Sequence, residues 1–277
     1  METTSTAIYC PLLKNTVFDE PEKLLREKTG MDTQKEAAHF DEVWRKVRPT
    51  KIIEELPIPG AQSLIGKRIL ICSCGSGRDP VRAANSGAEV FAVDLSPAGL
   101  QKSQEMAAFN HVSIDARVMD LHHLEFPDDY FDVLYGSAIL HHLDCAIAGA
   151  EFWRVLKNGG IGFFEAENTD RNPILAFFYR AMSGTDANGN FKKYWFVKRI
   201  GTTNERMFCR QDLDALRRYF PNALTRTDSF MFFQKISHVA GLRAIKLTRA
   251  MDKLAEFTLP ATRRYSYEQD IWFSKRI

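Results

Sequence analysis

The sequence contains no long apolar run, no surplus of one charge and no framework of paired cysteines. None of its apolar runs approaches the roughly 18 residues that a membrane-spanning helix needs. Its first residues, METTSTAIYCPLLKNT, lack the basic start and apolar core of a signal peptide. The 37 basic and 35 acidic residues leave a formal charge of +2, which does not favour nucleic acid or an anionic membrane as the main partner. These absences predict a cytoplasmic protein without a membrane span.

The five cysteines are informative mainly through their arrangement. Their number is odd and their spacing shows no paired framework, which fits a reducing compartment. Cys72 and Cys74 form a C-x-C pair, but no second cluster of Cys or His completes a tetrahedral metal site. We therefore expect no bound metal, and we interpret the pair as small buried residues.

The chain is organised around the stretch KRILICSCGSGRDPVRAANSGAEVFAVD, which ends at Asp94. It predicts, in order, a buried strand at Ile69–Cys72, a tight turn with Gly75 and Gly77, a helix over about 79–86 and a strand at Ala88–Val93. Asp94 then stands at the carboxyl end of the second strand. Ligands of open parallel sheets bind beyond that end, and a carboxylate there can accept both hydroxyls of a ribose. The unit therefore indicates a site for a nucleoside cofactor.

The residues at the start of the helix predicted over about 79–86 help to distinguish between nucleoside cofactors. A dinucleotide fold would require G-x-G-x-x-G opening the helix, but the third glycine position is Pro80. Arg78 and Asp79 also crowd this helix start, which suits a cofactor without a pyrophosphate. An NAD(P)-binding oxidoreductase of the Rossmann type stays an alternative.

Strands and helices continue to alternate after Asp94. The predicted elements are a helix from Ser96–Pro97 to Phe109, strands at Val112–Val118 and Phe131–Tyr135, a helix at Ala146–Leu156, a strand at Ile161–Glu165, a helix at Gln211–Tyr219, a strand at Leu224–Phe232, a helical stretch at Lys235–Phe257 and a strand at Tyr267–Phe273. This order predicts an α/β fold of the Rossmann-like, doubly wound type. We expect seven strands, mostly parallel, with the last one antiparallel at the edge of the sheet.

The first sixty residues predict a helical segment that precedes the α/β domain. We place that domain at residues 61–277. One short helix can span Glu22–Lys28. Thr33 and Glu36 form a capping box, after which Phe40 and Trp44 recur at helical spacing. A further short helix is expected at Thr50–Leu56. The aromatic pair can simply pack on the core, or the segment can be a lid that contacts substrate, or an arm exchanged in a homo-oligomer.

Residues 168–211 are predicted to form a helical cap inserted after the fifth strand. The insertion carries many aromatic residues, among them Phe178 and Trp195, which favours a largely apolar substrate. A polar loop at Ser183–Asn190 divides it. Its interleaved Lys and Arg, Arg206 included, can bind an anionic group such as a diphosphate or lie at the surface of an apolar cap.

Five motifs in this order resemble class I S-adenosylmethionine-dependent methyltransferases of the ubiquinone/menaquinone-methyltransferase-like type, also called type 11. They are ILICSCGSG, VFAVDLSP, MDLHHLEFPDDYFDVLYG, ILHHLD and RVLKNGGIGFFEAEN, and they cover roughly residues 40 to 170. The chain departs from the pattern at Ile71, where the family usually has an acid, and at Ser73, where it has a glycine.

The resemblance implies S-adenosylmethionine as the cofactor. By this similarity Gly75 and Gly77 face its methionine part, Asp94 its ribose and Asp120 its adenine. The remaining positions that the resemblance places around the cofactor are Ser73, Leu95, Leu121 and Ser137.

His141 and His142 follow the fourth strand and are the candidates for a general base, which a methyl transfer needs only when the acceptor keeps a proton at neutral pH. They can equally be pocket walls or contacts of a helix start. His122 and His123 are expected to be exposed. The leading hypothesis is transfer of a methyl group to carbon, oxygen or nitrogen of a small apolar metabolite. The alternatives are the NAD(P) oxidoreductase and a cofactor-binding descendant that does not methylate.

Overall fold

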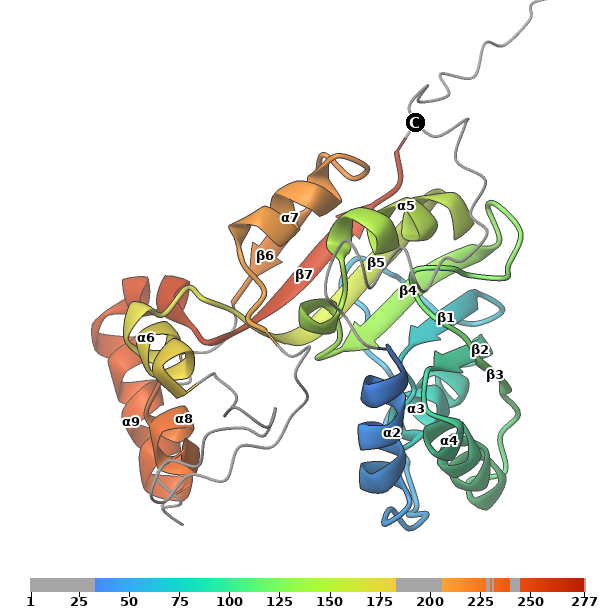
Figure 1. Ribbon diagram of the computed structural model, residues 1–277, viewed down its shortest axis with the longest axis horizontal. Coiled ribbons are helices and arrows are strands. Elements are labelled where there is room, and N and C mark those ends of the chain that lie inside the picture. The colour runs from blue at the N-terminus through green and yellow to red at the C-terminus, as the bar shows by residue number, and fades with distance from the viewer. Residues whose placement is uncertain (1–32, 183–205, 228–229, 231, 240–244, 277) are drawn as a thin grey trace, which may run out of the picture. The chain divides into compact units, whose positions relative to one another are not determined.

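The computed structural model describes residues 33–182, 206–227, 230, 232–239 and 245–276 (Figure 1). Its contacts divide the chain into Met1–Asp32 and Thr33–Ile277, and all described residues belong to the second unit. The helix expected at Glu22–Lys28 lies outside the described residues.

Seven strands form one sheet, as the sequence predicted. They are β1 Arg68–Cys72, β2 Glu89–Asp94, β3 Asp115–Val118, β4 Phe131–Ser137, β5 Leu156–Asn168, β6 Leu224–Arg226 and β7 Glu268–Ser274, in the order β3-β2-β1-β4-β5-β7-β6 (Figure 1). Strand β7 is antiparallel to both β5 and β6, and the other pairings are parallel. The expectation that β7 is the edge was wrong, because β6 pairs with it and takes the edge. The reversal after β1 places β1 and β4 at the switch point where ligands of such sheets bind.

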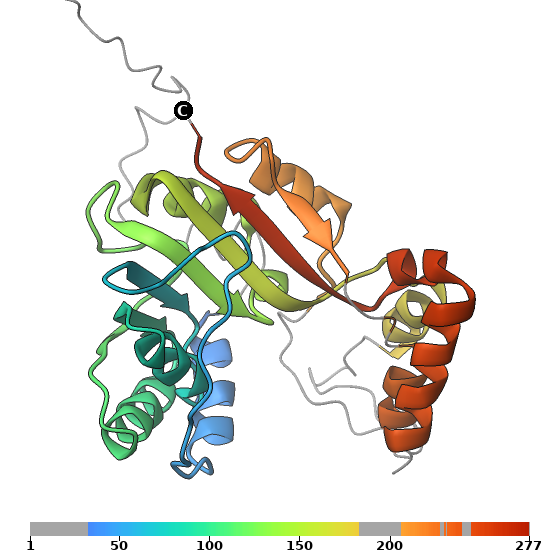
Figure 2. The same cartoon turned by 180° about the vertical axis from the view of Figure 1, so that it is seen from behind.

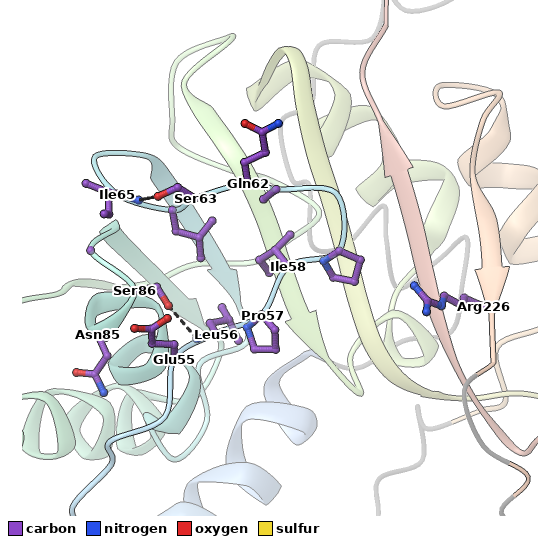
Figure 3. A pocket seen from close by; sticks show the side chains of 14 residues that line it. Glu55, Leu56, Pro57, Ile58, Gln62, Ser63, Ile65, Asn85, Ser86 and Arg226 are labelled. Carbon is purple, nitrogen blue, oxygen red and sulfur yellow. Dashed lines mark hydrogen bonds between the residues drawn. The ribbon is translucent and has the colours of Figure 1, made fainter.

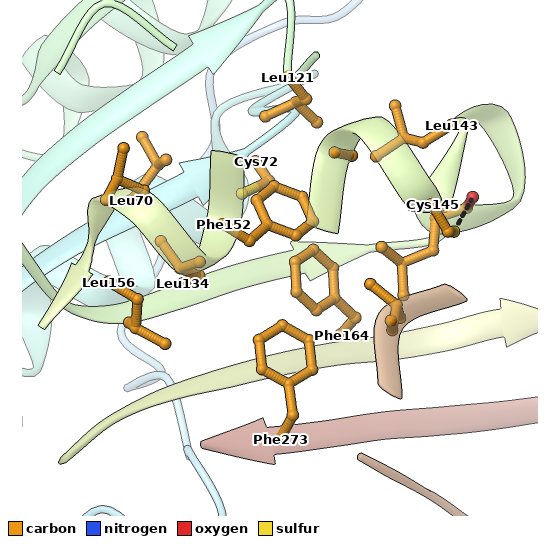
Figure 4. Packing of buried hydrophobic residues seen from close by; sticks show 14 of the residues in the cluster. Leu70, Cys72, Leu121, Leu134, Leu143, Cys145, Phe152, Leu156, Phe164 and Phe273 are labelled. Atoms are coloured by element: carbon orange, nitrogen blue, oxygen red, sulfur yellow. Dashed lines mark hydrogen bonds between the residues drawn. The ribbon is translucent and has the colours of Figure 1, made fainter. Parts of the chain in front are cut away.

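Helices cover both faces of the sheet, because successive side chains of its strands point to opposite faces and both sets are apolar. They are α2 Thr33–Trp44, α3 Arg78–Asn85, α4 Pro97–Phe109, the short η2 Leu140–His142 and α5 Cys145–Val155, followed by α6 Pro173–Met182, α7 Arg210–Arg217, α8 Phe232–Val239, α9 Ile245–Thr258 and η3 Pro260–Tyr265. Leu70 and Cys72 point to a core shared with α5 and α7 (Figure 4). Ile69 and Ile71 point to the other core, with α3 and α4. Both faces are therefore apolar, as in doubly wound folds.

The helix predicted at Thr50–Leu56 was wrong. This segment is extended, and side chains from the ends of α3 and α4 take up its backbone groups. Asn110 Oδ1 accepts from Ile52 N at 2.7 Å, and Ser86 Oγ accepts from Leu56 N at 2.9 Å. The chain then continues over the second face, where Pro59 O accepts from Trp272 Nε1 at 3.1 Å.

Figure 3 shows an open pocket beside this segment. It is lined by Glu55–Ile58, Pro59, Ala61–Ile65, Asn85–Gly87 and Arg226. None of these residues was predicted to belong to the site, and the pocket lies beside the start of β2 rather than its carboxyl end.

Two further expectations for the carboxyl-terminal half were wrong. The sixth strand ends at Arg226 instead of Phe232, and the single helical stretch Lys235–Phe257 is two helices, α8 and α9. Asp252 explains the start of α8, because its carboxylate accepts from the backbone N–H groups of Phe233 at 2.9 Å and Gln234 at 3.0 Å.

Helices α6 and α8 share a small apolar cluster with the start of β7, separate from the two main cores. Its members are Leu175, Ala176, Met207, Tyr267 and Phe232. Helices α8 and α9 also contact each other, and Figure 2 shows both of them from behind. Helix α6 falls within the cap predicted at 168–211, whereas residues 183–205 lie outside the description.

Candidate functional site

The turn after β1 holds three residues with left-handed backbone. Ser73, Gly75 and Gly77 have φ of 67°, 46° and 84°. A Cβ on Gly77 would lie 2.5 Å from Ser103 Cα of α4, so glycine is required there by packing as well as by φ. Ser73 takes a left-handed conformation that costs a non-glycine residue about 1–2 kcal/mol. The turn thus brings α3 close to α4 and directs the chain toward the end of β2.

Asp94 holds this turn from the end of β2. Its Oδ2 accepts from Gly75 N at 2.9 Å and from Ser73 Oγ at 3.3 Å, and its Oδ1 accepts from Ser96 N at 2.9 Å. The side chain is buried, and burial raises the pKa of Asp94 above its ordinary value of 3.8 despite these hydrogen bonds. A buried carboxylate therefore lies where the sequence predicted one.

Asp120 follows β3 and is joined to α5 through a histidine. Its Oδ1 accepts from His122 N at 2.8 Å and lies 2.7 Å from His122 Nδ1, while His122 Nε2 accepts from Asp144 N at 3.0 Å. Burial would raise the pKa of Asp120, but the hydrogen bonds from the side chain and backbone of His122 lower it below the ordinary value. The expectation that His122 is exposed was wrong, because its side chain is only 7% exposed and positions Asp120. His123 is exposed as expected.

His141 is buried beneath the site and bound to Glu167 of β5. His141 Nδ1 lies 2.7 Å from Glu167 Oε2, and Glu167 Oε1 accepts from Ile139 N at 2.8 Å and Leu140 N at 2.9 Å. Glu167 thereby fixes the first turn of η2. This environment corresponds to the helix-start contact that was the alternative to a base.

His142, the next residue, faces α2 instead. Its Nδ1 lies 2.7 Å from Glu36 Oε1, and the ring of Phe40 meets the histidine ring edge-on with centroids 5.8 Å apart. This contact is not aligned as a hydrogen bond, so among the described residues His142 Nδ1 and both Glu36 oxygens are buried polar atoms with no hydrogen-bond partner. The sequence identified Glu36 only as part of a capping box, and its place opposite His142 follows from the docking of α2.

Helix α2 docks on the glycine turn through Trp44 and Asp41. Ring atoms of Trp44 lie within 2.9 Å of where a Cβ would stand on Gly75 and on Gly99, so the ring packs flat against both glycines. Asp41 Oδ1 accepts from Ser96 Oγ at 2.5 Å and from Ala98 N at 3.0 Å, at the start of α4. Phe40 and Trp44, predicted as substrate contacts, therefore lie at the same edge as Asp94 and His142. Asp41 was missed because it belongs to none of the five motifs. Glu167 lies in the motif RVLKNGGIGFFEAEN, but its contact with η2 depends on how β5 and η2 pack.

The other residues that were predicted to line the site differ in how deeply they are buried. Leu95 is half-buried after β2, Leu121 belongs to the main core, and Ser137 is half-buried as the last residue of β4. Trp195, the loop Ser183–Asn190 and the side chain of Phe178 lie outside the described residues.

Arg206, one of the cations considered for an anionic group, is occupied within the fold. Its guanidinium donates to both oxygens of Asp212 at 2.6 Å and to Leu143 O at 2.8 Å. This pair ties the residues before α7 to the turn that follows η2.

The described ranges contain no cluster of three His, Cys, Asp or Glu side chains arranged to hold a metal ion. None of the helices in these ranges is both long and apolar enough to cross a bilayer.

Comparison with known proteins gives one family match. Residues 70–164 match the model of a methyltransferase domain. An uncharacterized protein of Mycobacterium tuberculosis is 35% identical over 96 residues, which make up 34% of this chain and 35% of that protein. The ubiquinone biosynthesis O-methyltransferase of Hahella chejuensis is 34% identical over 118 residues, 42% of this chain and 49% of the relative. The chain thus aligns with half or less of the length of these relatives.

Among solved structures, a SAM-dependent methyltransferase from Methanosarcina mazei superposes with a TM-score of 0.54 at 15% identity. The superposition covers 81% of this chain and 99% of the other. At this identity the likeness concerns the fold, and it agrees with the strand order described above.

Proposed function

We propose that this chain is a class I methyltransferase that transfers a methyl group from S-adenosylmethionine to a small, largely apolar molecule. The match of residues 70–164 to a methyltransferase domain and the strand order of the sheet support this proposal. The observation that carries the proposal is the buried Asp94 carboxylate, hydrogen-bonded to the glycine turn at the switch point of the sheet.

The residues at the strand ends fit this cofactor. Asp94 uses three of the roughly four acceptor positions of a carboxylate, so one is free for a ribose hydroxyl. Asp120, with its lowered pKa, is ionised at neutral pH and can accept from an adenine amine. We assign these two roles to Asp94 and Asp120, and the methionine part to Gly75 and Gly77. The surrounding contacts are assigned to Ser73, Leu95, Leu121 and Ser137.

When bound, this cofactor would supply a methyl group on a cationic sulfonium: an electron pair of the acceptor bonds to the methyl carbon in line with the breaking C–S bond, and the sulfur leaves as a neutral thioether. The protein then has to orient the acceptor, exclude water and, where the acceptor carries a proton, remove it. Orientation alone can supply roughly 7–11 kcal/mol of a barrier.

Of the two histidines, we propose His142 as the group that takes the proton. His141 is committed to Glu167 below the turn, whereas His142 Nδ1 and the Glu36 carboxylate meet without satisfying each other. His142 Nε2 can take the proton of an acceptor hydroxyl or amine, and Glu36, which lies beside Nδ1, stabilises the imidazolium that forms. The rings of Phe40 and Trp44 beside them suit an apolar acceptor. Phe178 and Trp195 are proposed to add to this surface.

Calorimetry with S-adenosylhomocysteine and NADH tests the cofactor. We expect binding of S-adenosylhomocysteine, weakened about tenfold to a hundredfold by Asp94→Asn, since charge-assisted hydrogen bonds are worth about 1.5–3 kcal/mol. Binding of NADH alone would mean an oxidoreductase.

Transfer of labelled methyl groups to a panel of phenols, prenyl diphosphates and amines tests the reaction. His142→Ala should lower turnover by about 10²–10⁴ for a proton-bearing acceptor, and Glu36→Gln should do so to a lesser degree. Binding of S-adenosylhomocysteine without transfer to any acceptor would favour the non-methylating descendant.

A further inference from the structure

Helix α9 buries its polar side and exposes its apolar side, which is the reverse of a helix that packs on an apolar core. The residues that it turns inward are polar: Thr248 and Asp252 are buried, and Glu256 is half-buried. Asp252 and Glu256 accept backbone N–H groups at or near the start of α8, so these acids hold the neighbouring helix. The burial of α9 is therefore directed by hydrogen bonding and not by an apolar stripe.

The apolar residues of α9 lie on its exposed side. Leu247, Met251 and Leu254 follow the i, i+4, i+7 spacing of one helix face. They and Phe257 are between 38 and 85% exposed. Leu259, just before η3, and Tyr265, its last residue, extend the exposed apolar surface. Together these six residues form what we call the outer face.

The charges around the outer face are of one sign. The basic residues of the segment 245–265 are exposed, namely Lys246, Arg249, Lys253, Arg263 and Arg264. Its two acids, Asp252 and Glu256, are the ones turned inward. The chain as a whole carries only +2, so this local excess is hidden in the overall composition.

We propose that the outer face of α9 and η3 binds the surface of an anionic membrane. A helix with exposed Leu, Met and Phe on one side and Lys and Arg along its edge lies in the headgroup region, where apolar burial and attraction to anionic lipid act together. A second copy of the chain would oppose like charges across the same face, because the segment has no exposed acid to pair with. Charge complementarity therefore favours anionic lipid as the occupant.

Cosedimentation of the full chain with vesicles tests the proposal. Vesicles of phosphatidylcholine with 30 mol% phosphatidylglycerol (about one anionic lipid in three) are compared with vesicles of phosphatidylcholine alone. We expect at least about tenfold tighter binding to the anionic vesicles, declining as salt is raised, because exposed charges are screened.

Two variants separate the apolar and the charged contributions. Leu254→Glu with Phe257→Glu should lower binding at least about tenfold, and Lys246→Glu with Lys253→Glu should remove the preference for anionic lipid. Ile53→Glu is the matched control, since Ile53 is 81% exposed outside this face, and it should bind as the wild type does. Circular dichroism confirms that each variant is folded.

Three outcomes would overturn the proposal. They are no binding by the wild type, equal binding by the Leu254/Phe257 variant, or a dimer in light scattering that this variant dissociates, which would assign the face to a second copy. None of these results depends on the methyl transfer, so the two proposals fail separately.

Discussion

At the scale of single residues, Asp94 and Asp120 are carboxylates in opposite electrostatic situations. Burial raises the pKa of Asp94, while the hydrogen bonds from His122 hold the pKa of Asp120 low although burial opposes them. As pH falls from neutrality, Asp94 takes up its proton first. The ribose contact should therefore be lost before the adenine contact.

This order predicts how cofactor affinity depends on pH. Calorimetry should show binding of S-adenosylhomocysteine weakening as pH falls, starting above the ordinary aspartate value of 3.8. In Asp94→Asn the affinity should be lower and nearly independent of pH over that range. A raised folded pKa means that this carboxyl contributes stability that is lost as pH rises through it. The same variant should still lower the Tm at pH 7, because the amide nitrogen of Asn cannot accept from Gly75 N or Ser96 N as a carboxylate oxygen does. An unchanged pH profile in Asp94→Asn would assign the titration to another group.

Ser73 illustrates what residue patterns can and cannot predict. The motif ILICSCGSG predicted a tight turn, and Ser73 adopts the left-handed backbone expected of the glycine that it replaces. Its Oγ also donates to Asp94, a contact between residues 21 apart in the sequence. The turn was predictable from glycine spacing, whereas the partner of the serine depends on how β1 and β2 pair.

At the scale of elements, the parallel strands were predictable because they are short apolar runs bounded by turn residues. The errors fall where a distant side chain decides the local structure. Residues 50–56 have helical composition, but Asn110 and Ser86 take their backbone N–H groups. Phe232 starts a helix because Asp252 caps it. Such contacts leave no periodic signal in the segment that they control.

The docking of α2 is a property of this element that one substitution can test. Asp41 accepts two hydrogen bonds from the start of α4, and the bond from Ser96 lowers its pKa, so it is ionised at neutral pH. Asp41→Ala should detach α2, speed limited proteolysis at 33–47 and weaken S-adenosylhomocysteine binding about tenfold. These hydrogen bonds to a charged group account for about 1.5–3 kcal/mol each.

Glu42→Ala is the matched control for this test. Glu42 is the neighbouring carboxylate, but it is 80% exposed and pairs only loosely with Lys46 at 3.6 Å, so its loss should change neither proteolysis nor affinity. Equal behaviour of the two variants would mean that Trp44 packing holds α2 without Asp41.

At the scale of the whole molecule, the described residues separate into two large apolar cores and two small clusters. The cores on the two faces of the sheet contain most of the buried apolar residues and include β1, β4, α4 and α5. The cluster of Leu175, Met207 and Tyr267 with α8 is much smaller. Small clusters open at lower free energy than large ones. The seven strands and the antiparallel direction of the last one could be predicted from the sequence, but the place of β6 at the edge could not. The cluster around Leu175 could not be predicted either, since its members come from four separate stretches.

Hydrogen exchange should therefore distinguish the two proposed ligands by where each slows exchange. S-adenosylhomocysteine at 100 times its Kd stabilises the state that binds it by about 2.7 kcal/mol, which corresponds to roughly a hundredfold slowing where exchange requires opening of the site. We expect this slowing at 73–77, at 94–99 and in α2, with little change in α8 and α9. Anionic vesicles should give the reverse pattern, with protection in α9 and η3. Slower exchange in α8 and α9 with S-adenosylhomocysteine in the absence of vesicles would contradict the separation of the two binding sites. It would mean that the small cluster around Leu175 folds together with the cofactor site.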